Sequence, residues 1–108
     1  MGNEDVIKIT ITFGPPADRD AFARHYVDVH APLVLALPGL RGYEYGPALT
    51  NFDGTPPDAF WVVALTFDSE GAMREAFASP AGQKTVDDMP NFITGPMTSV
   101  VSEILSRP

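Results

Sequence analysis

Two histidines and three tyrosines are the side chains of this sequence best suited to acid–base chemistry. Both histidines, His25 and His30, and one tyrosine, Tyr26, fall in the segment RHYVDVHAPLVLALPGL, residues 24–40, and Tyr43 and Tyr45 follow it closely. An imidazole titrates near neutral pH, so it can accept and return a proton during a reaction. The chain has no cysteine, which excludes a thiolate nucleophile, a thiolate metal site and a disulfide framework.

His30 is the leading candidate for a general acid or base, and a structural role in a buried helix is the open alternative. On a helical wheel that starts at Phe22, His30 lies about 80° round from Phe22, at the flank of the apolar stripe, and His25 lies on the opposite flank, about 140° from His30. Residues five apart do not share a face of an α-helix, so we expect no two-histidine metal site. His25 is the second catalytic candidate, with a partly exposed helix position as its alternative.

Four aromatic side chains are candidates for substrate binding or for packing. Tyr26 lies within the apolar stripe, and Trp61 lies in a strand that is apolar throughout, so we expect both in the core. Tyr43 and Tyr45 share one face of a predicted strand with Arg41. If that face points into a cavity, their phenols could bind or protonate an enolate-like oxygen, and if it points at helices they are packing residues.

Two adjacent carboxylates, Asp87 and Asp88, end a predicted helix, where negative charge opposes the helix dipole. That unfavourable position suggests a role such as orienting a histidine, and Asp87 is counted among the binding candidates. A solvated acidic turn before Met89 and Pro90 is the alternative. The sequence contains no nucleophile elbow, phosphate loop, dinucleotide fingerprint or zinc motif, so we expect no cofactor.

The elements that must position these side chains follow from periodicity. Residues 6–13, 40–49, 59–67 and 97–105 read as strands, and helices are predicted to start after Asp18, Ser69 and Ser79. The first helix should continue to Pro38, with a kink near His30 because Pro32 removes a backbone hydrogen bond. Its core stripe should be Phe22, Tyr26, Val29, Leu33 and Leu37, with Val34 and Leu35 on the outer side.

The predicted order β-α-β-β-α-β is that of a ferredoxin-like α+β fold, with a four-stranded antiparallel sheet and both helices on one face. The whole chain, residues 1–108, is one domain by its length. The strand at 59–67 is apolar on both sides, so the helix-free face of the sheet needs a cover. We therefore expect a homodimer in which two such faces enclose a shared interior, into which Lys8, Thr10 and Thr12 would point.

Charge and hydropathy narrow the possible partners. A net charge of −7 with scattered basic residues argues against nucleic-acid binding. No basic and apolar leader and no apolar run of about 18 residues is present, so we expect a cytoplasmic protein that does not bind a membrane.

The segment FARHYVDVHAPLVLALPGLRGYEY resembles the signature of the EthD family, which belongs to the dimeric α+β barrel, ferredoxin-like superfamily. The resemblance rests on the His25-Tyr26 pair, on His30 with Pro32 and Leu33, and on the turn at residues 38–40 with Tyr43. SPAGQKTVDDMPNF, residues 79–92, is similar to the second half of the family pattern. The family is named for a protein required in bacterial degradation of an alkyl ether. Its superfamily includes polyketide cyclases, isomerases and monooxygenases without metal or flavin.

These observations lead to two hypotheses of different class. The first is a cofactor-independent enzyme that abstracts a proton next to a carbonyl of a small hydrophobic, aromatic or polyketide-like compound, with cyclisation, isomerisation or dehydration as the outcome. His30 would be the acid–base group, and Tyr43 or Tyr45 would assist at the substrate oxygen. The second is a non-catalytic accessory protein that binds a small hydrophobic ligand in the same cavity.

Overall fold

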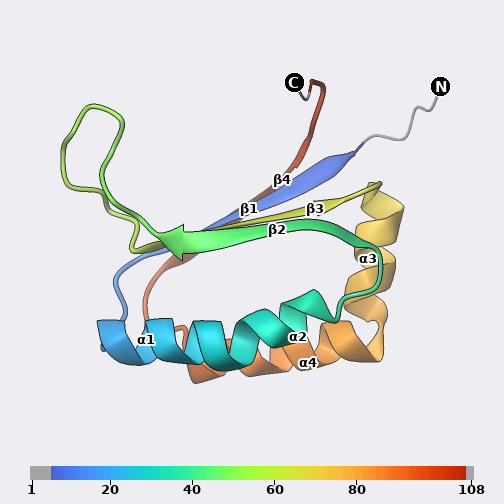
Figure 1. Cartoon of the computed structure of the whole chain (residues 1–108), viewed down its shortest axis with the longest axis horizontal. Helices are drawn as coiled ribbons and strands as arrows, with labels where there is room; N and C mark the ends of the chain where they lie inside the picture. The colour runs from blue at the N-terminus through green and yellow to red at the C-terminus, as the bar shows by residue number, and fades with distance from the viewer. Residues whose placement is uncertain (1–5, 107–108) are drawn as a thin grey trace.

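The computed structural model describes residues 6–106, which form a four-stranded sheet and a layer of helices (Figure 1). The elements follow in the order β1 (Ile7–Phe13), α1 (Arg19–His25), the π-helical turn η1 (Tyr26–His30), α2 (Ala31–Leu35), β2 (Leu40–Pro47), β3 (Trp61–Phe67), α3 (Glu70–Ala78), α4 (Pro80–Asp88), the 3-10 turn η2 (Met89–Asn91) and β4 (Met97–Glu103). This order confirms the predicted β-α-β-β-α-β pattern. None of these helices is long and apolar enough to cross a membrane within the described range.

The sheet has the strand order β2-β3-β1-β4, and every neighbouring pair is antiparallel. Alternation decides which side chains face the helices. In β1, Ile7, Ile9 and Phe13 are buried, and so are Trp61, Val63, Leu65 and Phe67 in β3. The core therefore lies between the sheet and the helices. Lys8, Thr10 and Thr12 point to the other side, as the alternation of the first strand predicted.

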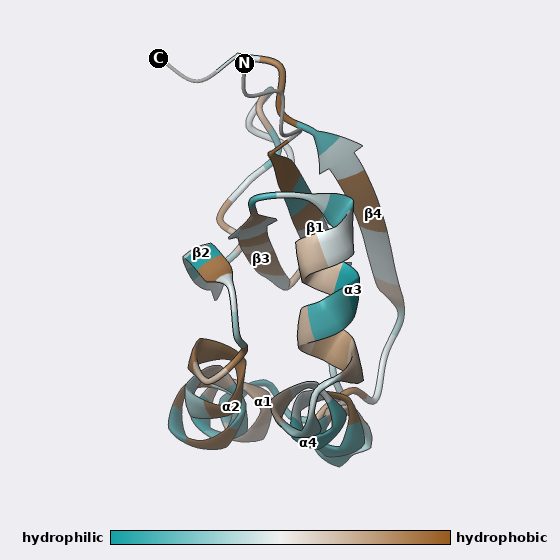
Figure 2. Ribbon diagram, turned by 90° about the vertical axis from the view of Figure 1, so that its right-hand side faces the viewer, coloured by the Kyte–Doolittle hydropathy of each residue, from teal (hydrophilic) through white to brown (hydrophobic). Residues whose placement is uncertain are grey.

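The opposite face of the sheet, here called the open face, carries no helix within residues 6–106. Figures 1 and 2 show α1, α2 and α4 all on one side of the strands. Val62 and Val100 remain 37% and 59% exposed on the open face. This is the face for which the sequence predicted a second copy as the cover.

The first helix starts as expected and then changes its hydrogen-bond pattern. Asp18 is the N-cap, and its side chain accepts a hydrogen bond from the backbone N–H of Ala21 at 3.0 Å. Pro32 has no N–H to donate, and the chain accommodates it with the π-helical turn over Tyr26–His30. In that turn the N–H of Ala31 bonds to the carbonyl of Tyr26, five residues back. The sequence predicted a kink near His30, and the structure has a π-helical turn that ends at His30.

The π-helical turn makes the predicted apolar stripe wrong after Tyr26, because it inserts one residue into the helical repeat. Val29 is 43% exposed and Leu33 only half-buried, although both were expected in the core. The buried positions are instead His30, Ala31 and Val34, followed by Leu37, which was predicted correctly. Val34 was expected on the outer side, and it is 3% exposed.

The second helical region follows the predicted cap residues. The hydroxyl of Ser69 accepts a hydrogen bond from Ala72 N–H at 3.0 Å, and the hydroxyl of Ser79 accepts one from Gly82 N–H at 3.2 Å. Gly82 lies against the backbone of Ala76 and Phe77, where a Cβ atom would clash. The close contact packs the start of α4 against the end of α3. Further along, α4 contacts α2, and its last residue, Asp88, reaches the histidines.

Candidate functional site

The carboxylate of Asp88 lies between the two histidines. His25 Nε2 is 2.9 Å from Asp88 Oδ1, and His30 Nδ1 is 3.0 Å from Asp88 Oδ2. The side-chain amide of Asn91 donates a third hydrogen bond to Asp88 Oδ1 at 3.0 Å. Asp88 and His30 are 7% and 6% exposed, so one buried carboxylate orients both imidazoles.

The expectation that the two histidines lie on different faces of the helix is wrong. It assumed an α-helix, in which residues five apart diverge by about 140°. In the π-helical turn the hydrogen bonds join residues five apart, so each residue turns the chain by less than in an α-helix. His25 and His30 reach the same carboxylate. Asp87, which the sequence suggested as a binding residue, is exposed. Asp88 is the residue that contacts the imidazoles.

His30 is packed among rings. Its ring centroid is 4.6 Å from that of Phe92 and 5.2 Å from that of Tyr26. Burial lowers the pKa of His30 below its ordinary value, and the hydrogen bond and negative charge of Asp88 only partly oppose that effect. A neutral His30 donates its Nδ1–H to Asp88, which leaves the lone pair on Nε2. Within the described residues Nε2 of His30 has no hydrogen-bond partner.

Asp88 itself stays ionised. Burial alone raises the pKa of this carboxyl, but the hydrogen bonds from Asn91, His25 and His30 together outweigh burial and hold the pKa below its ordinary value. The imidazoles thus meet a carboxylate, which accepts hydrogen bonds and fixes their tautomers. His25 is the more accessible partner, since 27% of its side chain is exposed, and Phe92 stacks on its ring at 5.6 Å.

Two tyrosine hydroxyls meet beside this group. Tyr26 and Tyr43 are joined by a hydrogen bond of 2.7 Å between their hydroxyl oxygens. Tyr43 pairs with Leu65 and Tyr45 with Val63, both core residues, so these phenols face the helices and not the open face. Of the two orientations left open by the sequence, this is the one expected for packing aromatics, and the phenols do not point into an interior shared by two copies. Burial raises the pKa of Tyr43 to about 12 and raises the pKa of Tyr26 further. Both phenols therefore stay protonated near neutral pH and can donate hydrogen bonds.

Trp61 lies in the core, as predicted, and it carries an unusual donor. Its indole Nε1 is fully buried and has no hydrogen-bond partner within residues 6–106. The ring lies 5.3 Å from Tyr26 and stacks against Tyr45 at 6.1 Å. Tyr45 is 38% exposed at the edge of the sheet, so it covers Trp61 from the solvent side. A buried N–H without a partner costs free energy, which an oxygen acceptor placed there would recover.

The structure brings most of the predicted site residues into one cluster between sheet and helices, here called the aromatic–histidine cluster: His25, Tyr26, His30, Tyr43, Tyr45 and Trp61. The sequence reading missed Asn91 and Phe92, which lie in a segment expected to be loop. Their sequence signals were their place just after the two carboxylates and, for Phe92, the resemblance of residues 79–92 to the family pattern. Within residues 6–106 no group of three or more histidine, cysteine or acidic side chains has the arrangement of a metal site.

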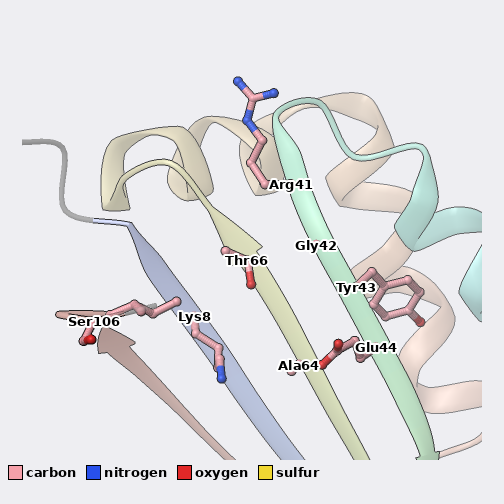
Figure 3. Close-up of a pocket in the computed structure, with 9 residues that line it drawn as sticks. Lys8, Arg41, Gly42, Tyr43, Glu44, Ala64, Thr66 and Ser106 are labelled. Atoms are coloured by element: carbon pink, nitrogen blue, oxygen red, sulfur yellow. The ribbon is translucent and has the colours of Figure 1, made fainter. Parts of the chain in front are cut away.

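A separate pocket of about 670 Å³ opens on the other side of the sheet, near the start of β1 and β2. Lys8, Glu44 and Thr66 line it, together with Ile104 and Ser106 after β4. Figure 3 shows Lys8 and Glu44 at this pocket, with the ring of Tyr43 turned towards the helices. The open-face pocket and the aromatic–histidine cluster are therefore on opposite faces of the same strands.

Residues 14–96 match the EthD domain. A relative in Rhodococcus erythropolis, an uncharacterised 11.0 kDa protein of the thcB–thcC intergenic region, is 36% identical over 96 residues, which cover 89% of this chain and 92% of the relative. Among solved structures, an EthD family protein from Bacillus halodurans superposes with a TM-score of 0.83 at 23% identity, over 93% of this chain and 99% of that one.

More distant structures share the fold. A dimeric ferredoxin-like protein from Thermobifida fusca has a TM-score of 0.72 at 16% identity, covering 94% of this chain and 93% of its own. The hydroxynitrile lyase of Passiflora edulis has a TM-score of 0.77 at 11% identity, with coverages of 97% and 99%. The cofactor-independent oxygenase SnoaB of Streptomyces nogalater has a TM-score of 0.68 at 14% identity, with coverages of 95% and 96%.

Proposed function

The chain belongs to the EthD family, and from this premise and the geometry of the aromatic–histidine cluster we propose that it is a cofactor-independent acid–base enzyme. Its substrate would be a small hydrophobic or aromatic carbonyl compound, and its reaction a cyclisation, isomerisation or dehydration. The observation that carries the proposal is His30, whose Nδ1–H is held by Asp88 while Nε2 is left without a partner beside the two joined phenols.

Each residue has a role that follows from its contacts. His30 Nε2 removes a proton from the carbon next to the carbonyl, and the resulting imidazolium is stabilised by Asp88. Tyr26 and Tyr43 stay protonated, and because one hydroxyl of the pair donates to the other, the pair has one O–H left to donate to the enolate oxygen. The unpaired Trp61 N–H is a further donor for such an oxygen. His25 and Asn91 hold Asp88 in place through their hydrogen bonds and need not touch the substrate.

Two fold relatives support catalysis on this scaffold. The hydroxynitrile lyase and the cofactor-independent oxygenase are enzymes with the same arrangement of strands and helices. Fold alone does not transfer a reaction, so the argument for this chain rests on its own side chains. The rings around His30 exclude water and favour an apolar substrate.

Hydrogen–deuterium exchange tests proton abstraction without knowledge of the final product. Small aromatic ketones and 1,3-diketones are incubated with the protein in D₂O, and loss of the α-proton signal is followed by NMR. His30→Gln, which can still donate a hydrogen bond to Asp88, should slow exchange by about 10²–10⁴-fold. Asp87→Asn, an exposed change of the neighbouring carboxylate, should not slow it. Equal exchange by wild-type protein and His30→Gln would remove His30 from the mechanism.

A non-catalytic ligand-binding protein is the second candidate, and the burial of His30 favours it. His30 is 6% exposed and Phe92 packs against its ring, so little of the base is accessible in this structure. Trp61 is the single tryptophan of the chain, and its fluorescence reports on ligands in the cluster. Binding of the same ketones that persists in His30→Gln, with no exchange by the wild-type protein, would favour this candidate.

We also propose that the chain is a homodimer through the open face of its sheet. The face exposes Val62 and Val100, and it carries no helix in the described part of the chain. The Thermobifida fusca neighbour is described as dimeric. Light scattering at micromolar concentration should give about twice the chain mass of 11.6 kDa. A monomeric mass at that concentration would contradict the dimer.

A further inference from the structure

The loop between β2 and β3, residues 48–60, is a defined structure held by its own hydrogen bonds. Asn51 N–H bonds to the carbonyl of Thr55 at 2.9 Å, and the N–H of Gly54 returns to the carbonyl of Asn51 at 2.9 Å. Asp53 accepts from the backbone and the hydroxyl of Thr55 at 3.0 and 2.6 Å. Gly54 has a φ of +89°, a conformation that side chains resist. The tip of the loop is therefore preorganised.

The same loop presents large apolar side chains that contact little else in the chain. Phe52 at its tip is 109% exposed and Leu49 is 85% exposed. A fixed loop with an aromatic residue held in water loses the free energy that burial of the ring would supply. Neither side chain belongs to the hydrophobic core. Apolar side chains on a preorganised loop are typical of a binding surface, since little ordering entropy is lost on contact.

The direction of the loop shows on which face of the sheet a partner in contact with it would lie. In Figure 1 the loop rises from the sheet on the side away from α1, α2 and α4, which is the side of the open face. The segment after β4 leaves the sheet on this side as well, and its Leu105 is 87% exposed. A molecule seated on the open face would lie between these two projections and would cover their apolar side chains.

Charge favours a second copy of this chain as that molecule. The chain carries a net charge of −7, so two copies repel each other over most of their surface. The open face is the exception, because Lys8 and Glu44 are the two charged residues among those that the strand pairing places there: Lys8, Thr10, Thr12, Gly42, Glu44, Gly46, Val62, Ala64, Thr66, Thr98, Val100 and Ser102. Two such faces meet without net repulsion, and Lys8 and Glu44 can pair reciprocally across a two-fold axis.

We propose that the loop at residues 48–60 is an arm with which each copy grips the other, with Phe52 and Leu49 packed against the partner. The proposal rests on the proposed homodimer and adds its decisive contact. Without the arm, the dimer depends on a face of mostly small side chains. With it, a rigid aromatic anchor is buried on each side, the kind of residue that supplies most of the binding energy in interfaces.

Sedimentation or light scattering over a dilution series tests the arm. Phe52→Ser should raise the dimer dissociation constant by roughly tenfold to hundredfold. Leu35→Ser, a change at a 66% exposed leucine on α2, is the matched control and should leave the constant unchanged. A monomeric wild-type protein overturns the dimer and the arm together. A wild-type dimer that Phe52→Ser does not weaken overturns the arm alone.

A cross-linking measurement decides what Phe52 touches. The chain has no cysteine, so Phe52→Cys creates a single site for a benzophenone label. Irradiation should give a covalent dimer whose cross-linked peptides come from β1, β4 or the segment after β4. The same label at Leu35→Cys should give no such dimer. Cross-links from position 52 to α1 or α4, or capture of no second copy, would refute the proposed contact.

Discussion

Asp88→Ala is the substitution that most directly tests the arrangement of the histidines. The change removes the shared acceptor of three hydrogen bonds, from His25, His30 and Asn91. His30 is 6% exposed, so its N–H is left unpaired away from water, whereas the partly exposed His25 can bond to solvent. An unpaired buried donor costs about 1–3 kcal/mol, and the other bonds contribute about 0.5–1.5 kcal/mol each.

The expected loss of stability is therefore about 2–6 kcal/mol. For a domain of this size each kcal/mol shifts the melting temperature by roughly 4–8 °C, so Asp88→Ala should melt at least about 8 °C below the wild-type protein. Urea unfolding at pH 7, followed by circular dichroism and by the fluorescence of Trp61, measures the free energy directly. Asp88→Asn keeps an acceptor oxygen in place and should lose less stability than Asp88→Ala.

Asp87→Ala is the matched control, because the neighbouring carboxylate is exposed at the same helix end. A surface change of this kind stays within about 0.5 kcal/mol of wild type. Equal stability of Asp87→Ala and Asp88→Ala would refute the shared hydrogen bonds. The dependence of stability on acid pH gives a second test. Because the pKa of Asp88 is held below 3.8, its stabilisation is present above that pH and is lost as the pH falls through the folded pKa. Asp88→Ala should lack this loss.

Three further predictions concern the same layer of the protein. The pKa of His30 in the folded protein lies below the ordinary 6.5, so between these two pKa values the unfolded state binds more protons than the folded state. The free energy of unfolding should therefore decline as the pH falls below about 6.5. Urea unfolding of His30→Gln at several pH values should lack this decline. Spectrophotometric titration at 295 nm should show Tyr43 ionising near its pKa of about 12, and Tyr43→Phe should remove that step; a normal phenol titration there would contradict the burial of the Tyr43 hydroxyl, which raises its pKa. Val34→Ala should lower the free energy of unfolding by about 1.5–3 kcal/mol, while Val29→Ala should lower it by less than about 0.5 kcal/mol. A larger loss for Val29→Ala than for Val34→Ala would support the α-helical stripe predicted from the sequence.

Local sequence patterns determined the elements of this protein because their causes are local. Strict alternation in residues 7–13 placed Ile7 and Ile9 against the helices and Lys8 on the other side. Side-chain caps at Asp18, Ser69 and Ser79 fixed the three helix starts. The order of these elements then allowed one fold class, because a split βαβ pair closes into a single antiparallel sheet with helices on one face. The family resemblance was confirmed on the same residues.

Tertiary structure decided the geometry of the candidate site. A helical wheel assumes one constant repeat, so it could not show that the turn at Tyr26–His30 would absorb Pro32 by becoming π-helical. That single change moved His30 into the core, turned Val29 outward and brought His25 to the same side. The choice of Asp88 over Asp87 depended on how α4 packs, 58 residues further along the chain from His30. Contacts between such distant segments depend on packing and leave no local pattern in the sequence.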